Sequence, residues 1–156
     1  MNRFVTLAIG CSIATSSLVA CESNEKKTAD FCSVVARVET ALAPLVLQLN
    51  SGDFPVPDEL KATLTNFRNQ LSEMSSVAPA AIADDMILVV NGFTAFDLGL
   101  QQVDYDYNLL FSDDEAAAQA EADMAAMDAP ETQDAMTAVD EFAFAECGIS
   151  LNTSGE

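Results

Sequence analysis

The longest regular pattern of apolar residues in the chain runs from Ile82 to Leu110. Apolar side chains recur there at alternating steps of four and three residues, which keeps one face of an α-helix apolar for about eight turns. The positions are Ile82, Met86, Val89, Phe93, Phe96, Leu100, Val103, Tyr107 and Leu110. This pattern predicts a long central helix that needs other helices to cover its apolar face. A transmembrane helix is excluded, because a span requires about 20 mostly apolar residues in a row and five aspartates interrupt this stretch.

Shorter segments on either side of the central stretch show the same helical spacing. The expected helices cover residues 30–50, 58–75, 82–110 and 131–147, and between the last two an Ala-rich helix that a capping-box pattern at residues 112–115 restarts and that extends to residue 127. Pro44 lies inside the first of them and should kink or split it, because proline removes a backbone hydrogen-bond donor. Pro130 separates the Ala-rich helix from the last helix, and no strand pattern persists along the sequence. We therefore expect an all-α protein.

Gly92 and Gly99 lie seven residues apart and so share one face of the predicted central helix. Each should cost about 1 kcal/mol relative to Ala inside a helix. One interpretation is a close contact with a neighbouring helix, or a bend, at the two glycines. The other is a groove that holds a ligand, and the sequence leaves both open.

Length and charge narrow the class of protein. The 156 residues suffice for one domain of ordinary size, and half of them are hydrophobic. Six basic residues stand against 25 acidic ones, the net charge is −19, and no basic residue follows Arg68. Such a field repels nucleic acids and anionic lipids. The negative charge favours cations or basic protein partners. Alternatively, it serves solubility alone, as in an organism that lives in salt.

The first 21 residues have the features of an export signal. Arg3 supplies a positive charge, residues 4–18 are apolar or small, and Leu-Val-Ala stands directly before Cys21. This ending resembles the lipobox of bacterial lipoproteins. The resemblance implies cleavage before Cys21, a lipid on that cysteine, and export to the extracytoplasmic side of a bacterial membrane. The alternative is an ordinary secretory signal in which the cysteine has no role.

This interpretation divides the chain into four parts. They are a signal peptide (1–20), a lipidated cysteine with a polar tether (21–29), a helical domain (30–149) and a loose C-terminal tail (150–156). The domain then contains two cysteines, Cys32 and Cys147, and such a pair outside the cytoplasm normally forms a disulfide. Cys32 starts the first predicted helix and Cys147 ends the last, so in an up-and-down bundle they meet only if the number of passes is even. We therefore expect an up-and-down helical bundle of about four passes, the last broken near Pro130, closed by one disulfide.

One segment, residues 104–115, overlays part of the EF-hand calcium loop. Oxygen-bearing side chains occupy the first, third, fifth, ninth and twelfth positions, where such a loop needs them. These residues are Asp104, Asp106, Asn108, Ser112 and Glu115. The sixth position is Leu109, although the sharp turn of the loop requires Gly. The alternative is that the central helix continues through the segment, because its apolar residues keep the helical spacing.

The sequence offers no recognisable catalytic set. It contains no His to act as a general base or metal ligand, no Gly-rich phosphate loop and no G-x-S-x-G motif. We therefore expect no enzymatic activity and no cofactor other than the calcium considered above. The leading hypothesis is an acidic binding or structural module, anchored to the cell envelope by lipid, with a basic or cationic partner and no nucleic acid. The alternative is a calcium-responsive module built on residues 104–115.

Overall fold

The computed structural model describes residues 16–51 and 55–151, with side chains from residue 24 onward except at residues 49 and 50. In these ranges the chain forms six helices and no strand, which confirms the predicted all-α class. The helices are α1 (Ser16–Ser51), α2 (Pro57–Val77), α3 (Ala83–Gln102), α4 (Leu109–Ser112), α5 (Asp114–Met124) and α6 (Pro130–Cys147).

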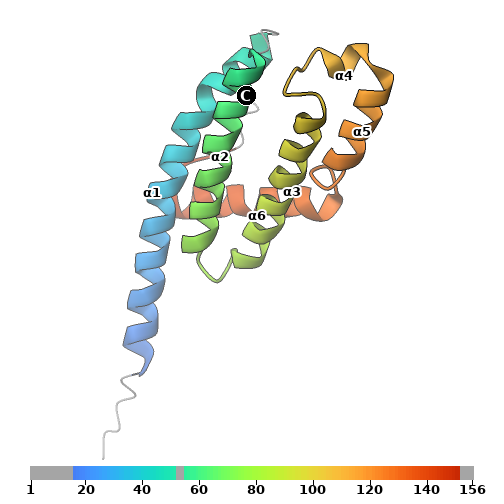
Figure 1. Cartoon of the computed structure of the whole chain (residues 1–156). Helices are drawn as coiled ribbons and strands as arrows, with labels where there is room; N and C mark the ends of the chain where they lie inside the picture. Colours follow the sequence, from blue (N-terminus) through green and yellow to red (C-terminus); the bar gives the residue numbers. More distant parts are fainter. Residues whose placement is uncertain (1–15, 52–54, 152–156) are drawn as a thin grey trace, which may run out of the picture.

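The helices form two layers. In the first layer, α1, α2, α3 and α5 lie side by side and alternate in direction, with the short α4 between α3 and α5 (Figure 1). In the second layer, α6 alone crosses behind the others and packs against α1 and α3. The predicted four-pass bundle is therefore not confirmed, since α5 and α6 do not form one broken pass. The chain changes direction at residues 125–129, before Pro130 opens α6.

Two clusters of buried side chains join the helices. The larger cluster lies between α6 and the first layer and includes the fully buried Phe31, Val35 and Met86. The smaller cluster joins α1, α2, α3 and α5 around Leu60 and Leu100. Full burial of one such side chain contributes about 1.5–3 kcal/mol to stability. The apolar residues that recur at helical spacing in α2 are all buried, which confirms the helix predicted over residues 58–75: Leu60, Leu64, Phe67, Leu71 and Met74.

The predicted central helix is wrong in its C-terminal part. α3 ends at Gln102, and the chain then turns instead of continuing as a helix. Asp104 and Tyr105 take left-handed backbone angles, with φ of 50° and 61°. This turn places the Tyr105 ring in the core, where its hydroxyl donates a hydrogen bond to Asp97. The apolar spacing does not reveal the end of the helix, because the apolar residues after Gln102 still pack into the smaller cluster.

α1 also differs from the expectation drawn from the sequence. It begins at Ser16 and includes residues 21–29, which the sequence predicts as a polar tether. Glu and Lys in this segment favour helix formation. Its described side chains, at residues 24–29, are exposed or half-buried, so their polarity is compatible with a helix at the surface. α1 also continues through Pro44, which is exposed, whereas the adjacent Leu45 is buried in the smaller cluster. Packing of α1 against α2 therefore outweighs the backbone hydrogen bond that proline removes.

The predicted disulfide between Cys32 and Cys147 is present, with the two Cα atoms 5.3 Å apart. The cysteines meet because α6 crosses back to α1, and not because the antiparallel passes are even in number. Next to the disulfide, the rings of Phe31 and Phe142 pack edge to face with centroids 5.6 Å apart. The C-terminal end of α6 is therefore fixed on α1.

Both glycines of α3 lie at close contacts with neighbouring helices. This favours the interpretation of their spacing as helix contact over that of a ligand groove. A Cβ on Gly99 would lie 2.5 Å from Cγ of Met124 and 2.8 Å from the backbone oxygen of Ala120 in α5. A Cβ on Gly92 would lie 2.6 Å from Cγ2 of Thr132 in α6. The missing side chains therefore allow α5 and α6 to approach α3.

Gly99→Ala should destabilise the protein, although alanine favours helices. The gain in helix propensity is about 1 kcal/mol, whereas overpacking costs about 1–3 kcal/mol. The upper part of that range applies, because the backbone oxygen of Ala120 cannot move aside without shifting α5. We expect urea unfolding to show a net loss of about 1–2 kcal/mol in the free energy of unfolding. A variant more stable than the wild type would contradict the close contact.

Candidate functional site

The five residues of the predicted calcium loop lie in different local structures. Asp104 and Asp106 belong to the turn after α3, Asn108 and Ser112 lie at the two ends of α4, and Glu115 lies in the first turn of α5. Oδ1 of Asp106 accepts hydrogen bonds from the backbone N–H and the side-chain amide of Asn108, both at 3.0 Å. Oγ of Ser112 donates to the backbone oxygen of Asn108 at 2.8 Å. These side chains thus stabilise the local backbone.

Helix α4 occupies the part of this segment where an EF-hand loop makes its turn. Asp113 caps α5, and its Oδ1 accepts hydrogen bonds from the backbone N–H groups of Glu115 and Ala116 at 3.1 Å. Among the described residues, no group of three or more His, Cys, Asp or Glu side chains is placed to hold a metal ion. Calcium binding by the five residues would require α4 to unwind. It stays a prediction, which a thermal melt in calcium against a matched magnesium control tests.

A buried carboxylate, that of Asp97, joins α2, α3 and the turn after α3. Its side chain is only 8% exposed. Oδ2 accepts hydrogen bonds from Nη1 of Arg68 at 2.8 Å and from Nε2 of Gln101 at 3.1 Å. Oδ1 accepts one from the Tyr105 hydroxyl at 3.0 Å, and Nζ of Lys61 lies 5.7 Å from the centre of the Tyr105 ring. Both carboxylate oxygens are therefore engaged, and we call these five residues the Asp97 cluster.

Asp97 was not singled out from the sequence, although helical spacing carries a signal for it. It follows Phe93 by four residues and precedes Leu100 by three, which places it beside the buried face of the helix. A carboxylate there requires a partner, and Arg68 provides it. The cluster also explains the turn, because the bond to Asp97 holds Tyr105 in a backbone conformation that costs about 1–3 kcal/mol.

The pKa values of both tyrosines of the chain are raised. Burial raises the pKa of Tyr105 above the ordinary value of 10.0, and the hydrogen bond and negative charge of Asp97 raise it further. Burial also raises the pKa of Tyr107. Both phenols therefore stay neutral in the folded protein at a pH where an exposed tyrosine begins to ionise.

Stability should accordingly fall as the pH rises above about 10. A phenol with a raised pKa holds its proton more tightly in the folded state, so its contribution is complete below the unfolded pKa and is lost as the pH rises through the folded pKa. Absorbance at 295 nm follows phenol ionisation, and Tyr107→Phe isolates Tyr105. We expect a midpoint near 10 in urea and a higher one in the native protein. Equal midpoints would contradict the burial of Tyr105.

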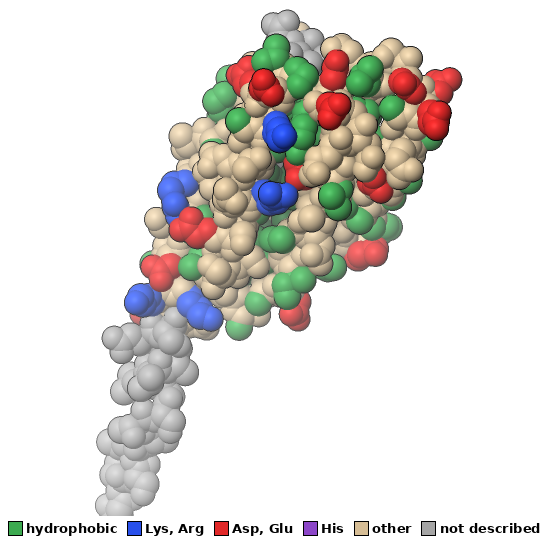
Figure 2. All heavy atoms as spheres, viewed as in Figure 1, with side chains coloured by type: hydrophobic (Ala, Val, Ile, Leu, Met, Phe, Trp, Pro, Cys, Tyr) green, Lys and Arg blue, Asp and Glu red, His purple; other side chains and the backbone are tan. Residues whose placement is uncertain are grey.

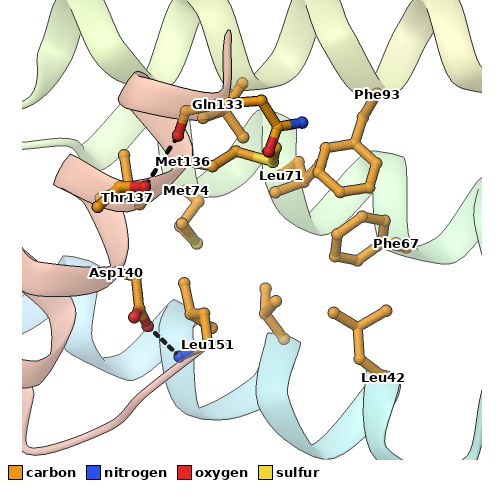
Figure 3. A pocket seen from close by; sticks show the side chains of 13 residues that line it. Leu42, Phe67, Leu71, Met74, Phe93, Gln133, Met136, Thr137, Asp140 and Leu151 are labelled. Atoms are coloured by element: carbon orange, nitrogen blue, oxygen red, sulfur yellow. Dashed lines mark hydrogen bonds between the residues drawn. The ribbon is translucent and has the colours of Figure 1, made fainter. Parts of the chain in front are cut away.

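A cavity of about 290 Å³ lies between α2 and α6. Ten of its thirteen lining residues are apolar, and they come from α1, α2, α3, α6 and the segment after α6. Figure 3 shows Phe67 and Leu151 among them. The three polar lining residues, Gln133, Thr137 and Asp140, all belong to α6. The sequence pattern does not predict this cavity.

Charge is distributed unevenly over the helices. From Asn24 on, every basic residue lies in α1 or α2, whereas the chain from α3 to the end of α6 contains sixteen acidic residues and no basic one. Figure 2 shows the basic side chains over α1 and α2, and acidic side chains at the opposite edge, where α4 and α5 lie. The field of the domain is therefore most negative on the side away from α1.

The predicted signal peptide and lipidation site lie mostly outside the described part of the chain. Residues 1–15 are not described, and residue 21 is described only as part of α1, without its side chain. Of the helices that the structure describes, none has the length and apolar character needed to cross a membrane.

No protein-family model, curated protein or solved structure matches this chain. Its function therefore has to be argued from its own residues. Two features of the described residues bear on function, the separation of charge and the cavity between α2 and α6, whereas the Asp97 cluster stabilises the turn after α3.

Proposed function

We propose that the protein is an exported lipoprotein, anchored through Cys21, whose helical domain binds a basic or cationic partner at the cell envelope and catalyses no reaction. The separation of charge supports this proposal. The part of the chain from α3 to α6 contains sixteen acidic residues and no basic one. These residues attract a basic surface, and no nearby basic residue repels it. The association rate with a basic partner is therefore raised, and acidic partners are disfavoured.

The N-terminal part of α1 supports a position away from the membrane. α1 is helical from Cys21 to Phe31, which is the first fully buried side chain that the structure describes, over about ten residues or 15 Å. α4 and the acidic α5 lie at the end of the molecule far from this segment (Figure 1). An anionic membrane would repel the domain, so a covalent lipid and a helical spacer would hold it near the surface without contact.

Labelling with a palmitate analogue in a bacterial host tests the anchor. The wild-type protein should be labelled and Cys21→Ser should not, because the lipid would be attached to that thiol. Cys11→Ser is the matched control and should be labelled like the wild type. Labelling of Cys21→Ser would refute the anchor.

A ten-residue oligolysine tests the acidic surface. It should bind at low salt and dissociate as salt increases, because surface charges are screened beyond about 8 Å at physiological ionic strength. Replacing Glu121, Asp128 and Asp134, all exposed, by their amides should weaken binding about tenfold at low salt.

The matched control neutralises three exposed acidic residues on the other side of the charge separation, Glu25, Glu39 and Glu59 of α1 and α2. Its net charge equals that of the first variant, so a difference in affinity reports the place of the charges and not their number. Equal weakening by both variants would show that the partner does not prefer α3–α6.

A further inference from the structure

Helix α6 is held at both of its ends. Near its N-terminal end, Thr132 packs so closely on Gly92 that a Cβ on the glycine would lie 2.6 Å from Cγ2 of the threonine. At its C-terminal end, the disulfide fixes Cys147 to Cys32 of α1. Between these two points α6 passes α2 without close backbone contact in the described chain. The cavity lies in this interval, and α6 cannot move inward to close it.

The cavity has an apolar interior and one polar edge. Phe67 of α2 and Phe93 of α3 pack edge to face on one side of it, with ring centroids 4.7 Å apart (Figure 3). The polar residues Gln133, Thr137 and Asp140 are four and three positions apart on α6, so they share one face of the helix. Gln133 and Thr137 are exposed, so the polar edge opens to solvent.

Asp140 also fixes the segment that follows α6. Its Oδ1 accepts hydrogen bonds from the backbone N–H of Leu151 at 2.6 Å and from Oγ of Ser150 at 3.1 Å. These bonds place Leu151 against the cavity (Figure 3). The next residues, 152–156, are Asn, Thr, Ser, Gly and Glu, and they offer no large apolar side chain to fill it. Water is also a poor occupant, because apolar walls offer it too few hydrogen bonds.

We propose that this cavity binds a small uncharged amphiphile, with an aliphatic body between α2 and α6 and a hydrogen-bond-donating head group beside Asp140. An apolar cavity of about 150 Å³ holds a molecule the size of benzene, so 290 Å³ accommodates about 12 non-hydrogen atoms. An anionic head group would lie beside a carboxylate in a protein of net charge −19, and is excluded by repulsion. This site shares only Asp140 with the acidic residues proposed above to attract a basic partner, and it does not depend on that partner.

Thermal melts of the purified protein with octan-1-ol and with octanoate test the proposal, because the two molecules share a chain and differ in charge. At ten times its dissociation constant, octan-1-ol should raise the melting temperature by about 3–6 °C. Octanoate, at the same concentration and ionic strength, should not raise it. The absence of a rise with octan-1-ol, or an equal rise with octanoate, would overturn the proposal.

Two variants locate the ligand. Met136→Trp fills the cavity from α6 and should abolish the rise with octan-1-ol, and Leu71→Phe fills it from α2 if the tryptophan is not tolerated. Asp140→Asn keeps the size and one oxygen acceptor of the side chain, so it should still bind octan-1-ol and should now bind octanoate as well. A filled variant that responds to octan-1-ol like the wild type would place the ligand outside this cavity and refute the proposal.

Discussion

Replacing Cys32 and Cys147 together by Ser is expected to lower the free energy of unfolding by about 4–5 kcal/mol. The disulfide joins residues 115 positions apart, so without it the unfolded chain regains the freedom of a loop almost as long as the domain. The melting temperature should fall by about 10–20 °C. Urea unfolding of the oxidised protein and of the double variant measures the difference.

The destabilisation should be greatest where α6 meets α1. The edge-to-face pair of Phe31 and Phe142 lies next to the disulfide, and hydrogen exchange should become faster in the last turns of α6 than in α2. Cys21→Ser is the control, since it removes a cysteine that takes no part in this disulfide, and it should leave stability unchanged. A double variant as stable as the wild type would mean that helix packing alone holds α6 on α1.

Apolar spacing was sufficient to predict α2 and α6, because each of them buries one face along its length. All five apolar positions expected in α2 are buried, and the disulfide of Cys32 with Cys147, which the sequence predicts, holds the end of α6 on α1. Local periodicity therefore predicts the helical class, and the expectation of an oxidising compartment predicts the disulfide that closes it.

The break after α3 and the direction of α6 could not be predicted in the same way. The spacing of apolar residues indicates which residues are buried. In residues 103–110 that spacing is compatible both with a continued helix and with a turn that returns to the core. Spacing also does not report the angle at which two helices cross. The cavity results from that angle, because α6 contacts α1 and α3 and leaves space over α2. The Asp97 cluster depends likewise on a turn that brings Tyr105 back to α3.

Asp97→Ala is expected to lower the free energy of unfolding by about 2–3 kcal/mol. The substitution removes the acceptor for Arg68, Gln101 and Tyr105 at once. The side chain of Arg68 is 45% exposed and can turn to water, so the cost stays below the roughly 3–5 kcal/mol of a fully buried pair. The Tyr105 hydroxyl cannot turn to water in the same way, because its ring is buried in the core.

The exposed pair of Arg37 and Glu73 is the matched control for Asp97. Its N–O distance is 2.6 Å against 2.8 Å for Arg68 and Asp97, but its side chains are 52% and 47% exposed. If burial and not distance decides the contribution, Glu73→Ala should leave stability nearly unchanged. A double-mutant cycle of Asp97→Ala with Arg68→Ala then separates the ion pair from the bond to Tyr105. Should Asp97→Ala cost no more than Glu73→Ala, the carboxylate would not hold the turn, and the left-handed backbone of Tyr105 would depend on the burial of its ring alone.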